Sequence, residues 1–297
     1  MTLTSPDGRA VRAPQERSRA GGIAMVLAAS VSNQAGAAAG ALAFPAIGPV
    51  GVVAVRQLVA ATVLTAVARP RLRGLSRDQW IPILGLAIVF SAMNLCLYAA
   101  VERIGLGLAV TLEFLGPLAV AIAASRRIID MVCAALAGIG VVVLTQPGPT
   151  SDPLGIGLAL TAAAAWAAYI LLNRTIGQRV PGIRGTAAAS LLTGAVWMPV
   201  AIVWFTVHVP SVSAIALAVV CGVFASVIPY ATDLLALRRI PATTFGTLAS
   251  LNPVWAALVG WVVLGQTLTL TAWLGLGIIV ASNAIVSVRG VRARPAR

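Results

Sequence analysis

The sequence predicts an all-α integral membrane protein with ten transmembrane helices arranged as two inverted five-helix repeats. Hydrophobic residues make up 59% of the chain and charged residues only 10%, against about 45–50% and about 25% in soluble domains. Breaks rich in Pro, Gly and Arg divide the chain into apolar runs that match the roughly 17–25 residues needed to cross a bilayer. A stretch in the second half also repeats one in the first half, which indicates a duplicated unit.

The predicted spans follow from these breaks, in chain order. The joints at 101–104 and 236–241 are short, and the fifth span is near the minimum length for a crossing. The spans are 22–43, 49–68, 81–101, 104–123, 130–146, 154–173, 185–207, 212–236, 241–264 and 268–287.

The spans define four parts of the chain. Residues 1–21 combine arginines and prolines with little apolar content, so we expect a disordered cytoplasmic arm. The apolar run that follows is too long for the core of a signal peptide, so it is an uncleaved first helix. Residues 22–146 form the first repeat, 154–287 the second, and 288–297 a basic cytoplasmic tail.

The arginines predict the orientation. The chain has 21 arginines and no lysine. With the N-terminus inside, nineteen fall in the arm, the tail or inside loops, Arg103 alone falls in an outside loop, and Arg56 lies within a span. Short positively charged loops stay in the cytoplasm, so both termini are predicted to be cytoplasmic. The net charge of +13 is therefore a topology signal, and no nucleic-acid partner is expected.

The repeat becomes visible when residues 94–122 are laid on 230–258 without gaps. Eight positions are identical, among them Pro117 and Pro253. A five-helix unit that is repeated must enter the membrane in the opposite orientation the second time. Inverted repeats are typical of secondary transporters, whose substrate site lies near the midplane between the halves.

Two charges lie within predicted spans, Arg56 in the second and Glu113 in the fourth. An ionised acid there costs roughly 2.5 kcal/mol or more unless a partner or a wet cavity receives it. The two could form a structural salt bridge, and Arg56 could instead meet backbone carbonyls or hold a substrate carboxylate with its planar fork. A carboxylate in a dry cavity takes up a proton more readily than in water, so Glu113 is the proton-coupling candidate. Pro117 removes the amide that would bond the Glu113 carbonyl.

Other polar or aromatic side chains within spans are candidates for the transport path, although packing and hydrogen bonding between helices would also explain each of them. The substrate-binding candidates besides Arg56 are Asn94, Tyr98, Trp166, Tyr169, Tyr230 and Asn252, and the pathway candidates are Asn33, Gln34 and Asp233.

Several kinds of chemistry are not expected. The cysteines Cys96, Cys133 and Cys221 lie in apolar runs without CxxC spacing, which favours small buried residues over disulfides or zinc ligands. His208 is the single histidine, and the absence of lysine excludes a Walker motif. We therefore expect no metal, no cofactor and no enzymatic activity, and no ATP-driven transport within this chain.

Several motifs resemble one transporter family. The segments that carry the resemblance are Met93-Asn94 with Tyr98, Leu112-Glu113-Phe114-Leu115-Gly116-Pro117, Ser125-Arg126-Arg127, Trp166 with Tyr169, Pro229-Tyr230, Thr244-Phe245-Gly246-Thr247-Leu248 and Leu264-Gly265. They resemble the threonine/homoserine exporter branch of the drug/metabolite transporter superfamily, with two EamA-type repeats, over about residues 22–287.

The resemblance implies a multi-pass exporter of small neutral amino acids in the bacterial inner membrane, working in exchange for protons through a central cavity. Arg56 and Glu113 match the charges of this family within the membrane. At three positions where the family often has glutamates, this chain has Asn252, Gln266 and Asp233. The loss of an acid at the first two of these positions makes Glu113 the stronger candidate for proton coupling. The implied partners are an amino acid, protons and the lipid bilayer, and a homodimer is an open alternative to a monomer.

Other functions stay open from the residues alone. Export of other metabolites or drugs fits the same superfamily. An enzyme acting on lipid-linked substrates would need clustered acids or a nucleophile at the membrane surface, and the membrane acids here are single and spread out. A passive helical scaffold would have little reason to keep Arg56 and Glu113 inside the membrane.

Overall fold

A computed structural model of the chain consists of helices and short joints in the residues it describes, with no strand among them. These residues are 12–70, 72–123, 152–180, 183–237 and 251–292, with isolated positions at 128, 132, 136, 139, 140, 143 and 248. Most of the predicted fifth span and most of the first half of the ninth lie outside them.

Six helical segments among these residues are long and apolar enough to cross a membrane, and three more are apolar but shorter. The multi-pass membrane class is therefore confirmed, while the count of ten helices stays a prediction. The helices are α1 (Arg12–Leu42), α2 (Phe44–Ala68), α3 (Arg77–Ile104), α4 (Leu106–Glu113), α5 (Leu115–Ala123), α7 (Pro153–Arg179), α8 (Arg184–Val207), α9 (Val212–Gly222), η1 (Val223–Val227), α10 (Ile228–Leu237), α12 (Asn252–Leu264) and α13 (Leu270–Arg292).

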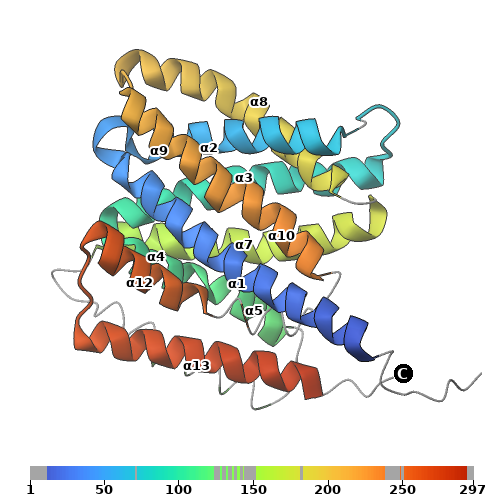
Figure 1. Cartoon of the computed structure of the whole chain (residues 1–297). Coiled ribbons are helices and arrows are strands. Elements are labelled where there is room, and N and C mark those ends of the chain that lie inside the picture. Colours follow the sequence, from blue (N-terminus) through green and yellow to red (C-terminus); the bar gives the residue numbers. More distant parts are fainter. Residues whose placement is uncertain are drawn as a thin grey trace, which may run out of the picture.

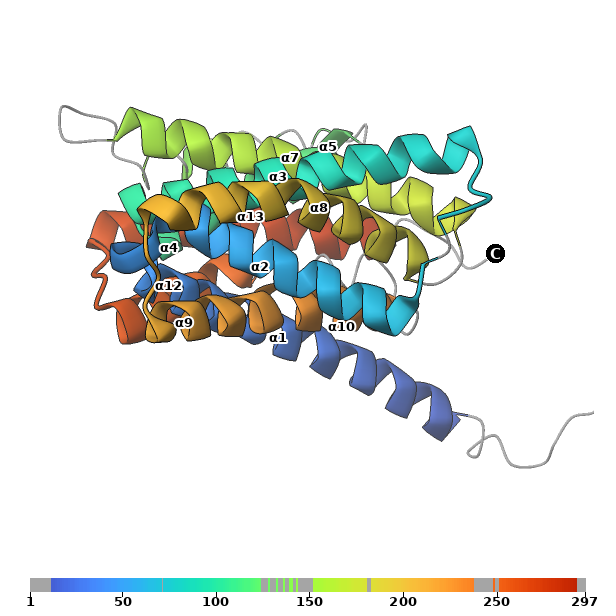
Figure 2. The same cartoon turned by 90° about the horizontal axis from the view of Figure 1, so that it is seen from above.

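The helices run roughly along a common direction (Figures 1 and 2), and Figure 1 shows α8 at one edge of the bundle and α13 at the opposite edge. The joints α1–α2, α3–α4, α8–α9 and α12–α13 gather at one end, and the joints α2–α3 and α7–α8 at the other. This alternation is what the arginine pattern predicts for segments on the two sides of a membrane.

Helix packing pairs elements from the two halves of the chain. Helix α2 packs along α8, and α4 packs on α12. Helix α3 packs on α7 and α8, while α9 and η1 pack on both α1 and α2, and α10 packs on α1. Helix α1 also packs on α12, as α7 packs on α4 and α5. The interior therefore lies between the halves, which is where the candidate site residues gather.

Several apolar helices are interrupted close to this interior. Glu113 ends α4, and Leu115 begins α5 after a turn at Phe114. At the corresponding place in the second half, a turn at Leu251 precedes α12, whose first residues are Asn252 and Pro253. Between α9 and α10 the helix passes through the five-residue π-helix η1. Backbone irregularities of this kind occur frequently at functional sites.

Close helix contacts at glycines hold the interrupted elements in place. Helix α1 meets η1 at Gly36, where a Cβ atom would lie 2.7 Å from the Ala225 backbone nitrogen. Helix α5 meets α7 at Gly116, where a Cβ atom would overlap the carbonyl oxygen of Ala163. Small residues allow helix backbones in membranes to approach this closely.

Candidate transport site

Arg56 of α2 lies at the centre of a polar cluster in the bundle interior, and only 4% of its surface is exposed. Its Nε atom donates to Ser226 Oγ at 2.6 Å, and an Nη atom donates to the Ala225 carbonyl oxygen at 2.6 Å. Both partners belong to η1. The sequence left open whether Arg56 meets an acid or a backbone carbonyl, and the structure shows the carbonyl.

Tyr98 of α3 lies against the same guanidinium. The Arg56 Cζ atom is 5.1 Å from the Tyr98 ring centroid, within the range of cation–π attraction. The Tyr98 hydroxyl is 3.0 Å from Cys221 Sγ, and either atom can be the donor. Arg56, Tyr98 and Cys221 thus join α2, α3 and α9 by polar contacts inside the membrane part of the bundle.

The other two tyrosines lie beside Phe90 of α3. The Tyr230 ring stacks on Phe90 with the centroids 5.1 Å apart, and the Tyr169 ring is 5.8 Å away. Asn94 donates to the Phe90 carbonyl oxygen at 2.7 Å. The Tyr230 hydroxyl lies near Asn94 and Ser226, but in geometries that complete no hydrogen bond to either. The hydroxyl and Asn94 Oδ1 are both buried without hydrogen-bond partners, so this region has capacity for a polar ligand.

Glu113 lies at the break between α4 and α5, and 6% of its surface is exposed. It interacts electrostatically with Arg56, but no ion pair joins the two. The structure therefore does not contain the salt bridge that the sequence left open. The ring of Phe114, the residue after Glu113, meets the half-buried Trp166 edge to face at 5.3 Å.

The remaining candidates are more dispersed. Gln34 of α1 donates to Asn252 Oδ1 of α12 at 3.5 Å, a long hydrogen bond between the two halves, and Gln34 Oε1 is buried without a partner. Asn33 is half-buried. Asp233 lies in α10, but its side chain is outside the described residues.

Four residues with polar contacts in the structure are not among the site residues that the sequence predicts. Ser226 and Cys221 contact Arg56 and Tyr98, and Gln57 donates to the Phe90 carbonyl oxygen at 3.0 Å. A polar residue directly after Arg56 in an apolar span was a readable signal for Gln57. Gln266 accepts a hydrogen bond from the Leu106 amide at 2.9 Å and so caps the start of α4, a role that sequence spacing does not reveal.

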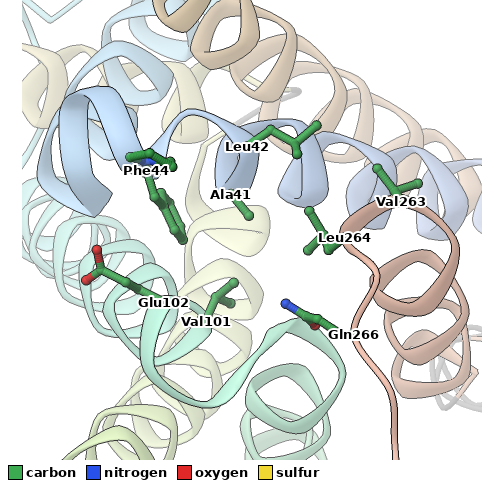
Figure 3. A pocket seen from close by; sticks show the side chains of 9 residues that line it. Ala41, Leu42, Phe44, Val101, Glu102, Val263, Leu264 and Gln266 are labelled. Atoms are coloured by element: carbon green, nitrogen blue, oxygen red, sulfur yellow. The ribbon is translucent and has the colours of Figure 1, made fainter.

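Two cavities lie at the ends of the bundle, and neither is lined by Arg56 or Glu113. The larger has a volume of about 470 Å³ and is bounded by the joints α1–α2, α3–α4 and α12–α13 (Figure 3). The smaller, about 100 Å³, lies beside Gln79 and Arg184 at the opposite end. Among the described residues, no group of three or more His, Cys, Asp or Glu side chains could hold a metal ion.

One ion pair closes the end of the bundle that holds the larger cavity. Arg103 Nε lies 2.8 Å from Asp152 Oδ2, which links the last turn of α3 to the residue before α7. Asp152 Oδ1 also accepts from the Gly155 amide at 2.9 Å. The Gly155 N–H, supported by Arg103, lowers the pKa of the Asp152 carboxyl below its usual value.

A bundle of apolar membrane-spanning helices with a buried guanidinium, a buried acid and unpaired polar groups between its halves has the features of a multi-pass membrane transport protein. Comparison with known proteins agrees with this class. Residues 153–288 match the EamA-like transporter family.

Two curated relatives are similar over most of the chain. The threonine/homoserine exporters RhtA of Escherichia coli (strain K12) and of Salmonella typhimurium (strain LT2) are each 35% identical over 264 residues, which cover 88% of this chain and 89% of theirs. The chain therefore belongs to the RhtA-type branch of the drug/metabolite transporter superfamily, and it is a transporter rather than an enzyme.

Two further similarities are more distant. The uncharacterized transporter YwfM of Bacillus subtilis (strain 168) is 26% identical over 159 residues, about half of each chain. A crystal structure matches with a TM-score of 0.63 at 19% identity, over 94% of this chain and 100% of that chain. At that identity it supports the fold alone.

Proposed function

We propose that this chain exports small neutral amino acids resembling threonine and homoserine across the bacterial inner membrane, in exchange for protons. The observation that carries the proposal is the 35% identity to the threonine/homoserine exporters over nearly the whole chain. The buried Arg56 and Glu113 support it, because charges inside a membrane protein mark substrate and ion pathways.

Arg56 is the proposed site for the substrate carboxylate. A guanidinium binds a carboxylate with two parallel hydrogen bonds, and Arg56 has no acid in contact with it among the described residues. Asn94 Oδ1 and the Tyr230 hydroxyl supply unpaired polar groups within the same interior. Tyr98, Tyr169, Trp166 and Asn252 complete the proposed binding region, with Asn33, Gln34 and Asp233 along the path.

Glu113 is the proposed proton carrier. It is the buried acid of the interior among the described side chains, and it lies where the helix is interrupted. Electrostatic interaction with Arg56 would link its protonation to whether a substrate carboxylate is bound. Exchange then needs no nucleotide and no cofactor.

The proposed architecture is two inverted five-helix repeats with both termini in the cytoplasm. The packing pairs support it when each predicted span is exchanged for the span five places away in the other half. Span three (α3) then exchanges with span eight (α9 to α10), span four (α4 and α5) with span nine (which ends in α12), and span six (α7) with span one (α1). Under this exchange the α3–α7 contact becomes α10–α1, and the α5–α7 contact becomes α12–α1. Such an exchange also maps the α2–α8 contact onto itself. This pattern is expected of a twofold axis in the membrane plane.

Counterflow in proteoliposomes tests the substrate. Vesicles with purified protein are loaded with threonine or homoserine, and uptake of labelled threonine is measured. We expect saturable exchange. Absence of saturable exchange would defeat the substrate assignment and favour export of other metabolites or drugs, which the resistance profile of an overexpressing strain would reveal.

A second measurement separates proton coupling from binding. With an imposed pH gradient, wild-type protein should accumulate threonine against its gradient, whereas Glu113→Gln should only equilibrate it. The matched control is Asp78→Asn, an exposed acid in the first turn of α3, which should behave as wild type. Uphill transport that is unchanged in Glu113→Gln would contradict the coupling role.

A further inference from the structure

The cavity of about 470 Å³ lies where the joints α1–α2, α3–α4 and α12–α13 meet (Figure 3). All three joints belong to segments that the arginine pattern places outside the cell. The volume is within the roughly 300–1,000 Å³ that is typical of small-molecule sites. Polar groups come from Glu102 at its edge and from Gln266, whose amide faces the cavity in Figure 3.

Two aromatic rings in edge-to-face contact separate this cavity from Arg56. Phe44 lines the cavity, and its ring meets the edge of Tyr98 with centroids 5.9 Å apart and an interplanar angle of 72°. Tyr98 in turn covers the guanidinium of Arg56 at 5.1 Å. A molecule passing between the cavity and Arg56 along this line must displace at least one of the rings.

Tyr98 is the fixed ring of the pair. Only 1% of its surface is exposed, and its hydroxyl contacts Cys221. Helix α1 closes the space beside it at Gly40, where a Cβ atom would lie 2.8 Å from Tyr98 Cε1 and 3.0 Å from Cys221 Sγ. Any displacement of Tyr98 would therefore move α1 or α9 as well.

Phe44 is the less buried ring of the pair. It is half-buried and belongs to the first turn of α2, directly before Pro45. Gly48 interrupts that helix with φ 63° and ψ 172°, a conformation that glycine adopts without strain. The turn that carries Phe44 is thus joined to the rest of α2 through a glycine, and changes at a few such backbone angles are how hinges open.

We propose that this cavity is the outer vestibule of the transport path, which receives the zwitterionic amino acid after it leaves Arg56, and that Phe44 is the outer gate on the Gly48 hinge. The proposal rests on the proposed function. Glu102 at the rim complements the ammonium group of the substrate, while the inner site at Arg56 takes the carboxylate.

Cys221 offers a native reporter, because it lies behind Tyr98 on the inner side of the gate. With Cys96→Ala and Cys133→Ala as the parent, an anionic, membrane-impermeant methanethiosulfonate is added to right-side-out vesicles. Phe44→Ala should raise the rate of Cys221 labelling about tenfold. This is the upper end of the effect expected when one aromatic contact that stabilises the closed state is removed and the open state becomes more populated. Phe44→Leu should give a smaller increase, and Phe44→Tyr should label as the parent does.

The control is Phe224→Ala, which truncates an exposed ring three residues from Cys221 and away from the cavity. It should leave the labelling rate at the parent value. Threonine should slow the labelling of Phe44→Ala, because an occupied vestibule blocks the reagent. Equal labelling of Phe44→Ala and the parent would overturn the gate, and so would faster labelling in inverted vesicles. Labelling that threonine leaves unchanged would overturn the vestibule.

Threonine counterflow is measured in the same vesicles, so that the two proposals fail separately. Wild-type protein without counterflow would defeat the proposed function, whatever the labelling shows. Counterflow by wild-type protein together with unchanged labelling in Phe44→Ala would defeat the gate and leave the function intact.

Discussion

Arg56 donates hydrogen bonds to Ser226 and to the Ala225 carbonyl while Tyr98 covers its face. Lysine carries the same charge, but its ammonium is a compact point charge without the planar fork of arginine. The role proposed for Arg56 therefore depends on shape as well as charge, and a conservative substitution can separate the two.

We expect Arg56→Lys to raise the KM for threonine about 10- to 100-fold, since loss of one charge-assisted hydrogen bond is worth about 1.5–3 kcal/mol. Counterflow at varied threonine concentration measures this effect. The matched control is Arg179→Lys, an exposed arginine that donates to the Asp78 carbonyl oxygen. Equal KM values in wild type and Arg56→Lys would contradict a carboxylate clamp.

The Asp152 carboxylate at the end of the bundle should make the stability of the folded protein depend on pH. Its pKa is lower in the folded protein than in the unfolded chain, so its contribution is fully present above about pH 4, near the unfolded pKa. The contribution is lost as the pH falls through the lower folded pKa.

Thermal unfolding in detergent across acidic pH checks this contribution by comparing two variants with wild type. Asp152→Ala should unfold at lower temperature than wild type at pH 7, because it removes both the ion pair and the bond from Gly155. Asp152→Asn should keep the helix cap and lose only the ion pair. The difference between wild type and either variant should shrink below about pH 4. A constant difference would contradict the assignment.

At the scale of helices, the position of Glu113 depends on how closely α5 approaches α7. Gly116 allows this approach, because a Cβ atom there would overlap the Ala163 carbonyl oxygen. A backbone oxygen cannot move aside as a flexible side chain can. The helix that begins after Glu113 would therefore shift as a unit.

Gly116→Ala should destabilise the protein by about 1–3 kcal/mol, the usual cost of overpacking. Gly157→Ala in α7 is the matched control, since no atom lies within 4 Å of the Cβ position there, and alanine favours a helix over glycine. The melting temperature and the monodisperse fraction in detergent measure both variants. A Gly116→Ala protein as stable as the control would show that α5 is not seated as described.

For the whole molecule, the sides of the membrane are the main prediction. With single cysteines in a background without native cysteines, Val209→Cys in the α8–α9 joint should react with an impermeant reagent in right-side-out vesicles. Thr2→Cys in the N-terminal arm should react only in inverted vesicles. The opposite pattern would reverse the predicted orientation and move the proposed gate to the cytoplasmic side.

The helical class and most crossings could be predicted from the sequence, because apolar length and arginine placement are local properties of the chain. Contacts such as Arg56 with Ser226, 170 residues apart, depend on how the helices pack and leave no local pattern. The same holds for Gln266, which caps α4 from a position 160 residues away. The π-helix η1 also lies in an ordinary apolar run, Val223–Val227, without a local signal.

The π-helix η1 and a substrate carboxylate would compete for the N–H groups of Arg56. A substrate carboxylate can bind the N–H groups of Arg56 that η1 does not use. If it instead draws the whole guanidinium toward itself, it takes N–H groups away from Ser226 and the Ala225 carbonyl. A buried carbonyl that loses its donor favours another arrangement of its own backbone. Loading the site would then favour a regular α-helix in place of the π-turn. Because an α-helix rises farther per residue than a π-helix, the segment between α9 and α10 would lengthen, and cargo binding would reset the register of that helix.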